Sequence, residues 1–340
     1  MNLTYASPDD ALAAPTSSPA ADARREALLQ LLRTLDQDGY EFVTVTPGSH
    51  ARVIARPDRQ VAKSVRDVLG WSLPFTPDVM PPALLDRLRA AGVVSQRDDG
   101  MLAAQVRVSS VRGTLFLHSA FPTTDYDSVF LGPDSYRFAD LIVAKMGDLP
   151  AGARILDYGA GAGVGGISAA REQRDAVLTL ADLNPKALFL SSINAEFADV
   201  DHRAVQATSP TDVESDFDLI VTHPPFMMDD DGRAYRDGGD LFGARLSLDW
   251  VLAGVKKLTP GGKLILHTGV SIVDGRDVLY EHIVRELTGA EWDVDYHELD
   301  PDIFSEDLGE PAYAEVERIA AVGLCVTRRG GNAPLFGAAR

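Results

Sequence analysis

The chain has 340 residues, of which 45% are hydrophobic and 24% are charged, so it is long enough to bury one large core or two modest ones. Fifty acidic residues against 32 basic ones give a formal net charge of −18, which disfavours nucleic acid as a partner because phosphates must be neutralised by cations. The single cysteine, Cys325, excludes an internal disulfide framework and a cysteine-based zinc cluster.

The first 23 residues are rich in Ala, Ser, Pro and Asp, which predicts a flexible tail. They lack the basic start and the apolar run of a signal peptide, and no stretch there is long enough for a membrane span. We therefore expect a cytoplasmic protein without a membrane partner.

Residues 24–118 are predicted to form an accessory domain of α+β type. Apolar residues at helical spacing predict a helix from Arg24 to about Leu35, and Pro81 opens a second helix that ends near Gly92. Short apolar runs then predict a β-ribbon, and a helix followed by a ribbon resembles a winged helix. The ribbon strands are expected at Val93–Val94, Gln105–Ser109 and 113–117, the first two on either side of the turn Asp98-Asp99-Gly100.

Winged helices often bind nucleic acid, but the basic residues of this segment are scattered among acidic ones. We favour a role as a substrate cap or as a dimerisation domain, so a homodimer is among the expected assemblies. The loop-like residues 119–133 predict a linker. A helix from Tyr136 to about Met146 is expected to lead into the next domain.

Residues 134–328 alternate strand-like and helical segments. This alternation predicts an α/β fold with a mainly parallel sheet and helices on both faces, in which ligands bind at the carboxyl ends of the strands. The expected strands are Arg154–Asp157, Ala176–Ala181, Asp218–Thr222 and Lys263–His267, followed by Trp292–Leu299 and Ile319–Thr327 around an acidic insertion at 300–317. Residues 329–340 predict a second flexible tail.

The first of these strands runs into a glycine-rich turn. Gly159, Gly161 and Gly163 follow Asp157 at alternate positions, where residues without a Cβ can take unusual dihedrals and let a ligand approach the backbone. The second strand leads to Asp182, 25 residues after Asp157, and a carboxylate there can accept both hydroxyls of a ribose. The glycine spacing also satisfies the pattern of a nicotinamide or flavin site.

The strand at 218–222 stops on the tetrad His223-Pro224-Pro225-Phe226. The two prolines stiffen the backbone and remove N–H donors, and Phe226 offers a flat face for stacking or for a cation–π contact. Neutral imidazole has one acceptor nitrogen, so His223 could orient a nucleophile or act as a general base. The alternative is that His223 only ties the loop to a neighbouring carbonyl.

The glycine turn and the tetrad, in this order and about sixty residues apart, resemble motifs I and IV of class I S-adenosylmethionine (SAM) methyltransferases. The Asp-x-Asn-Pro pattern at 182–185 is similar to the small-domain superfamily that includes the glutamine methyltransferases of release factors. The resemblance covers residues 133–328 and implies a Rossmann-like sheet with an antiparallel last strand, and SAM as the cofactor. By this resemblance the cofactor-binding residues are Asp157, Tyr158, Gly159, Gly161, Gly163, Asp182, Asn184, Ser135 and Tyr136, and the catalytic residues are His223, Pro224 and Phe226.

The tetrad of this family begins with Asn, Asp or Ser, so His223 is a departure. A substrate with an ammonium, hydroxyl or carboxyl group would gain more from an imidazole than a planar amide would. Residues 207–209, Ala-Thr-Ser, stand where the family often carries an acid or amide to read adenine, so the adenine contact is left open. The remaining histidines show no metal-ligand spacing, and no metal site is expected.

Together these patterns predict a SAM-dependent methyltransferase that acts on a nitrogen or oxygen nucleophile of a small molecule or a protein. Methylation of rRNA, tRNA or DNA is the first alternative, which the net charge opposes. A SAM-using enzyme that does not transfer methyl, with the sulfonium as leaving group in a cyclisation, is the second. A non-catalytic interaction module is the third.

Overall fold

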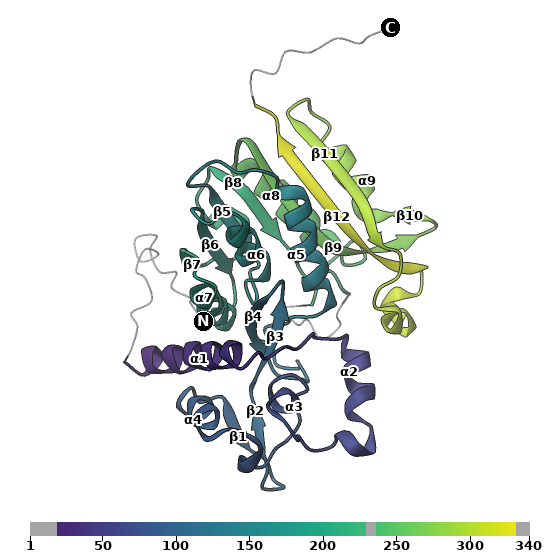
Figure 1. Cartoon of the computed structure of the whole chain (residues 1–340). Helices are drawn as coiled ribbons and strands as arrows, with labels where there is room; N and C mark the ends of the chain where they lie inside the picture. Colours follow the sequence, from purple (N-terminus) through teal and green to yellow (C-terminus); the bar gives the residue numbers. More distant parts are fainter. Residues whose placement is uncertain (1–18, 229–235, 331–340) are drawn as a thin grey trace, which may run out of the picture.

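The computed structural model describes residues 19–228 and 236–330 of the chain. Its N-terminal region combines helices with two β-hairpins (Figure 1). The helices are α1 (Pro19–Gln37), α2 (Pro47–Ile54), α3 (Val65–Leu69) and α4 (Pro82–Ala90), and the strands are β1 (Val94–Gln96), β2 (Leu102–Ala104), β3 (Val106–Val111) and β4 (Thr114–Ser119). Short 3-10 turns at Pro57–Arg59 and Pro77–Val79 join them.

The N-terminal helix is longer than predicted, since α1 begins at Pro19 and includes the last residues of the expected tail. Residues 1–18 and 331–340, which make up the rest of the two predicted tails, lie outside the described residues. The helix α4 followed by a β-hairpin agrees with the predicted order of elements, and Phe75 adds a short antiparallel bridge to Leu102. The winged-helix interpretation itself stays a prediction.

The pairing of the predicted ribbon was wrong in one respect. The strand opposite β1 is β2, whereas the predicted strand Gln105–Ser109 belongs to β3, which pairs with β4. The turn between β3 and β4 consists of Arg112 and Gly113, both with positive φ (47° and 71°). Two consecutive positive φ angles match the twist of a tight hairpin, so β3 finds its partner locally.

The larger part of the chain forms an α/β fold around one mixed sheet, which confirms the predicted fold class. The strand order is β11-β12-β9-β8-β5-β6-β7, with parallel pairing from β9 to β7 and antiparallel pairing of β12 with both neighbours. The strands are β5 (Arg154–Tyr158), β6 (Val177–Asp182), β7 (His202–Gln206), β8 (Phe217–Thr222), β9 (Leu258–Val273), β11 (Trp292–Asp300) and β12 (Arg318–Arg328), and the short β10 (Arg276–Asp277) pairs with β9.

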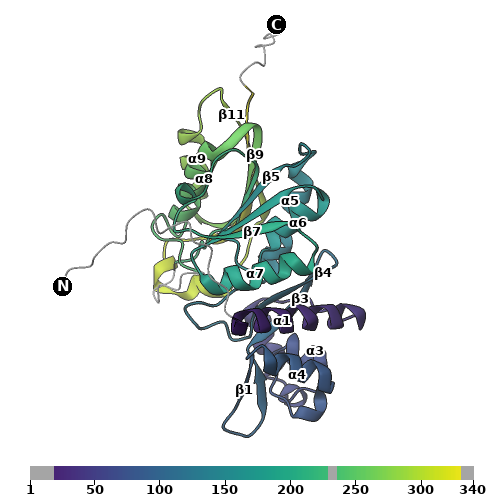
Figure 2. The ribbon, with the colours of Figure 1, turned by 90° about the vertical axis from the view of Figure 1, so that its left-hand side faces the viewer.

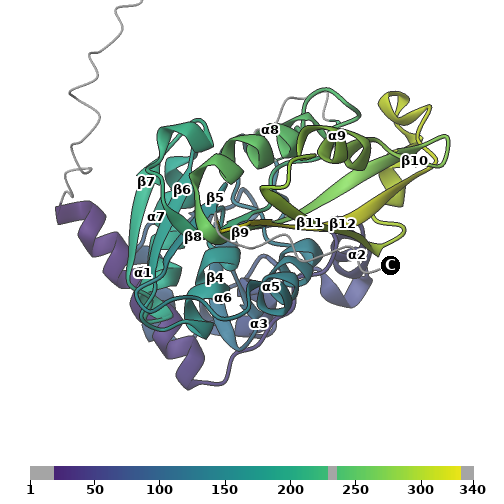
Figure 3. The same cartoon turned by 90° about the horizontal axis from the view of Figure 1, so that it is seen from above.

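Helices cover both faces of this sheet, as predicted (Figure 3). The helices α8 (Arg245–Gly254) and α9 (Val278–Glu286) lie on one face. On the other face lie α5 (Pro133–Met146), α6 (Val164–Glu172) and α7 (Pro185–Phe197). Of this second group, α7 packs against α1 and β4 of the N-terminal region.

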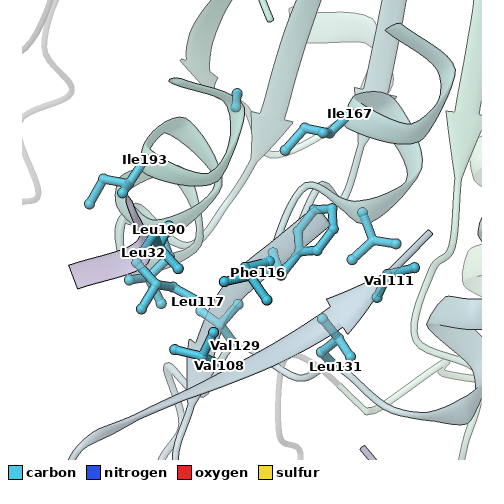
Figure 4. Close-up of a cluster of buried hydrophobic side chains, with 14 of the residues drawn as sticks. Leu32, Val108, Val111, Phe116, Leu117, Val129, Leu131, Ile167, Leu190 and Ile193 are labelled. Atoms are coloured by element: carbon cyan, nitrogen blue, oxygen red, sulfur yellow. The ribbon is translucent and has the colours of Figure 1, made fainter. Parts of the chain in front are cut away.

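The N-terminal region and the sheet domain share one hydrophobic core. Leu32 of α1 and Phe116 of β4 belong to the same buried cluster as Ile193 of α7 and Ile167 of α6 (Figure 4). The helix α1 runs beside α7 (Figure 2), and the Asn194 side chain bonds both the N–H and the C=O of Leu117, at 2.8 and 3.0 Å. The predicted limits of two separate domains, 24–118 and 134–328 with a linker at 119–133, stay a prediction.

Candidate active site

A cavity of about 620 Å³ opens at the carboxyl ends of β5, β6 and β8. This volume lies within the range of about 300–1,000 Å³ that is usual for small-molecule sites. Both predicted motifs meet there, because the carboxyl ends of parallel strands share one edge of the sheet. Of the predicted site residues, the cavity lining includes Asp157, Tyr158, Gly159, Gly161, Asp182, Asn184, Ser135, His223, Pro224 and Phe226.

The glycine turn after β5 needs glycine at each alternate position. Gly159, Gly161 and Gly163 have positive φ angles of 71°, 53° and 80°. A Cβ on Gly159 would lie 2.6 Å from the Trp250 ring, and a Cβ on Gly163 would lie 2.9 Å from Ile167. A Cβ on Gly161 would meet no atom closer than 4.0 Å. Gly163 supports the turn from behind, outside the cavity lining, while Gly161 faces open space where a ligand can approach its backbone.

Asp182, at the end of β6, holds the glycine turn by its carboxylate. Its Oδ2 accepts a hydrogen bond from the Gly161 N–H at 2.8 Å, and its Oδ1 accepts one from the Asn184 N–H at 2.8 Å. Burial raises the pKa of Asp182, and the hydrogen bonds from Asn184 and Gly161 act in the opposite direction. Each carboxylate oxygen keeps a second lone pair for a further donor.

Asp157 lies beneath this turn and is fully buried. Its Oδ2 accepts the Gly166 N–H at 2.7 Å, within the first turn of α6. Burial raises the pKa of Asp157 to about 7; the Gly166 hydrogen bond lowers it, and the Asp182 charge raises it further. The carboxyl can therefore gain or lose a proton near neutral pH.

Three predicted cofactor contacts have other partners, and one of them is Ser135, whose Oγ accepts the Gly132 N–H at 3.3 Å. The Asn184 side chain caps α7 by accepting the Lys186 N–H at 2.9 Å, and its amide donates to the Asp127 carbonyl at 2.8 Å. Tyr136 is outside the cavity lining, and its hydroxyl accepts the Thr44 N–H at 2.9 Å. Consecutive helical residues point about 100° apart, so Ser135 can face the cavity while Tyr136 faces the N-terminal region.

The tetrad after β8 presents an imidazole to the cavity. His223 Nδ1 lies 2.8 Å from the His267 carbonyl oxygen and 3.3 Å from His267 Nδ1. A carbonyl can only accept, so His223 Nδ1 carries the hydrogen and Nε2 is left as the acceptor. Burial lowers the pKa of His223, while the nearby Asp134 charge raises it. The His223 imidazole thus ties the loop to a carbonyl through Nδ1 and keeps Nε2 as an acceptor.

His267 itself is placed differently from the sequence expectation. It was expected at the end of a strand, but β9 continues to Val273 and His267 is fully buried. Burial, the neighbouring His223 and Arg137 all lower its pKa. His267 therefore supports the tetrad from behind.

The Phe226 ring packs against a glycine in β9. A Cβ on Gly269 would lie 2.3 Å from the Phe226 ring, so a larger residue there would displace the ring. The Phe226 ring centroid lies 5.8 Å from the His223 ring and 5.8 Å from the Phe304 ring. The Phe138 ring lies 5.5 Å from His223. Sequence reasoning missed Phe138 and Phe304, which come from elements far from the motifs.

Further cavity residues were also missed. Trp250 of α8 packs edge-on against Tyr158 at 4.5 Å, and Leu183 is 51% exposed at the end of β6. The sequence offered one signal, a leucine directly after a predicted ribose-binding acid. Thr208, in the segment 207–209 where the adenine contact was left open, also lines the cavity, and its hydroxyl donates to Asp212.

The segment that follows the tetrad includes residues 229–235, which lie outside the described residues. The described part returns to the tetrad, where the Gly238 N–H donates to the Met227 carbonyl at 2.8 Å. Within residues 19–228 and 236–330, no group of His, Cys, Asp or Glu is placed to hold a metal ion. No helix in the same ranges is long and apolar enough to cross a membrane.

Part of this chain is similar to proteins of known family. Residues 138–266 match the family model described as methyltransferase small domain. Release factor glutamine methyltransferase of Deinococcus radiodurans is 29% identical over 157 residues, 44% of this chain and 54% of the relative. Ribosomal RNA small subunit methyltransferase C of Pasteurella multocida is 30% identical over 125 residues, 37% of this chain and 35% of the relative. The chain therefore spans about half or less of the length of these curated relatives.

A methyltransferase of solved structure from Pyrococcus furiosus is 15% identical, with 59% of this chain and 89% of that chain covered and a TM-score of 0.41. The family match extends from α5 to β9 and includes the glycine turn, Asp182 and the tetrad. Over residues 138–266 this chain is thus similar to the methyltransferase small domain family.

Proposed function

We propose that this chain is a SAM-dependent methyltransferase that acts on a nitrogen or oxygen nucleophile of a small molecule or a protein. The observation that supports this most is one cavity that joins Asp182 and the glycine turn to the His223 tetrad. A cofactor held by the first group would present its reactive end to the second.

The residues on the cofactor side fit SAM. Asp182 has lone pairs for the two ribose hydroxyls, and the exposed Leu183 side chain beside it offers an apolar surface for the adenine ring. Gly161 allows the amino-acid end to approach the backbone, and the carboxyl of Asp157 lies below the same turn. When bound, SAM would supply a methyl group on a sulfonium, which is an electrophile of high reactivity.

The tetrad fits the acceptor side. Methyl transfer is an in-line displacement, so most of the acceleration comes from positioning the nucleophile and from excluding water. Pro224 and Pro225 have no N–H that would compete for acceptors, and Phe226 supplies a ring wall. His223 Nε2 can accept a hydrogen bond from the nucleophile and then its proton.

Cofactor binding and turnover test this proposal separately. We expect SAM to bind in calorimetry and S-adenosylhomocysteine to form with substrate. Methylthioadenosine in its place would indicate the non-methylating alternative, and no SAM binding would indicate an interaction module.

The variant His223→Ala should lower turnover by about 100-fold or more, as for loss of a general base, and leave SAM affinity unchanged. The control is His282→Ala on α9, outside the cavity lining. Normal turnover of His223→Ala would make His223 a structural tie only.

Charge distribution leaves nucleic acid as a second candidate substrate. Residues 19–118 carry 13 basic and 11 acidic residues, whereas residues 119–330 carry 18 and 37. The acidic excess therefore lies outside the N-terminal region. The charge of that region opposes RNA binding less strongly than the net charge of the whole chain implies. Salt-sensitive retention on an RNA column would favour this candidate, and flow-through at low salt would exclude it.

A further inference from the structure

The acceptor side of the cavity is walled by aromatic rings. Phe138 and Phe226 lie 5.5 and 5.8 Å from the His223 ring, and Phe304 lies 5.8 Å from Phe226. Phe304 has a φ of 53°, a left-handed conformation that is rare for a bulky side chain. It is packed with the cluster around Met227, which sets its position against the tetrad. A flat ring is the shape that such walls accommodate best.

The polar groups beside His223 favour a ligand with a hydrogen-bond donor and disfavour a negatively charged ligand. Nε2 is an acceptor, because Nδ1 donates to the His267 carbonyl. Asp134, which is 2% exposed, lines the same wall, and its charge acts on the His223 ring. A carboxylate at this position would meet a like charge, whereas an O–H or N–H would meet an acceptor.

The described arginines near this wall, Arg137 and Arg236, are already paired. Arg137 binds Asp134 at 3.0 Å and Asp300 at 2.7 Å, and Arg236 forms an ion pair with Asp307. An anionic acceptor would have to compete with these carboxylates for a guanidinium. An ammonium would be tolerated by Asp134, but it has no lone pair with which to attack the methyl group.

We infer that the acceptor is a neutral planar ring that carries an O–H or an N–H, of the phenol or azole class, hydrogen-bonded to His223 Nε2. This inference rests on the proposed methyl transfer. In the step, a lone pair of the phenol oxygen, or of the azole nitrogen that gives up its N–H proton, forms the bond to the methyl carbon as the carbon–sulfur bond breaks, and the electrons of that bond stay on sulfur. The proton of the acceptor passes to Nε2, where the Asp134 charge stabilises the imidazolium.

Small probes of matched size test the inference on the full chain saturated with S-adenosylhomocysteine. The neutral probes are 4-methylphenol and 4-methylpyrazole, which distinguish the phenol class from the azole class. The charged controls are 4-methylbenzoate and 4-methylbenzylammonium. We expect at least one neutral probe to bind roughly 3–10-fold more tightly than both controls at pH 7.5, the effect of about one net hydrogen bond.

The variant His223→Phe keeps a ring in place and removes the acceptor. It should lower affinity for the preferred neutral probe by the same roughly 3–10-fold and leave the controls unchanged. In case this variant folds poorly, ¹⁵N spectra of the unmodified protein supply a second readout: the neutral probe should move the Nε2 resonance of His223, and the controls should not.

Tighter binding of either charged control, equal binding of all four, or no binding of any would overturn the inference. SAM calorimetry on the same sample separates these outcomes from failure of the proposed function. If SAM binds and only the probe preference fails, the methyltransferase proposal stands without this substrate class.

Discussion

Asp157 lies in an environment unlike that of an ordinary carboxyl. Its pKa is raised to about 7 mainly because it is buried, and its carboxylate accepts a hydrogen bond from the Gly166 N–H. An unfolded aspartate titrates near 3.9, so the native state holds the proton more tightly than the unfolded state. The resulting stabilisation is complete below about pH 4 and is lost as the pH rises through about 7.

The variant Asp157→Asn should remove this pH dependence, because its amide oxygen can still accept the Gly166 N–H and cannot ionise. The wild-type protein should lose up to about 4 kcal/mol more unfolding free energy than the variant between pH 4 and pH 8, measured by urea denaturation. Asp175→Asn, at an exposed acid that accepts the Gly152 N–H, is the control and should follow the wild type. Parallel curves for Asp157→Asn and the wild type would show that Asp157 is ionised throughout.

Asp182 is expected to carry much of the cofactor affinity. The change Asp182→Ala removes the acceptor for the Gly161 and Asn184 N–H groups as well as the proposed ribose contact. SAM binding measured by calorimetry should weaken by about 1–3 kcal/mol. Asp175→Ala removes a comparable backbone contact on the loop before β6, away from the cavity, and should bind SAM normally. Unchanged affinity in Asp182→Ala would remove this residue from the site.

At the scale of elements, β9 shapes the acceptor side of the cavity at a glycine, a residue without a side chain. Gly269 leaves room for the Phe226 ring, and a Cβ there would come within 2.3 Å of it. The change Gly269→Ala should displace the ring and lower turnover by roughly 10–100-fold, since small misplacements of positioning groups are costly. SAM affinity, measured in parallel, should stay within twofold. Gly289→Ala, with no atom closer than 3.8 Å, is the control.

The strands that hold the site could be predicted because they are apolar along their length. β5 and β8 are buried on both faces between helices, so each reads as a continuous hydrophobic run ending in a motif. β7 was missed since it lies at the sheet edge and its residues are mostly exposed, which leaves no hydrophobic pattern. The β3–β4 pairing was missed because the Arg112-Gly113 turn carries a weaker signal than Asp98-Asp99-Gly100.

The residues of the candidate site could be predicted where they lie next to the end of a strand. Asp182 and His223 directly end or follow a strand, so their sequence neighbours identify them. Phe304 reaches the cavity only through the packing of a segment about eighty residues away, which no local pattern reveals. Tyr136 shows the converse, because one residue along a helix is enough to turn a side chain out of the cavity.

On the scale of the whole molecule, the N-terminal region is joined to the α/β fold by side chains rather than by a linker alone. The Arg25 and Glu196 side chains form an ion pair between α1 and α7, and Asn194 holds the backbone of β4. Buried apolar residues on both sides form one cluster. A continuous core of this kind implies that the two regions unfold together.

Leu32 offers the test of this cooperativity, because it is fully buried on α1 within the shared cluster. The change Leu32→Ala should lower the unfolding free energy by about 2–5 kcal/mol through a lost side chain and a cavity. Variants that keep only Trp71, in the N-terminal region, or only Trp250, beside the glycine turn, report the two regions by fluorescence. Both signals should shift to the same lower denaturant midpoint, whereas Val43→Ala, at a residue 60% exposed, should shift neither. A shift confined to the Trp71 signal would mean that the two regions unfold independently. The chain would then consist of two unfolding units that meet near the predicted domain boundary at residue 118, despite the shared core.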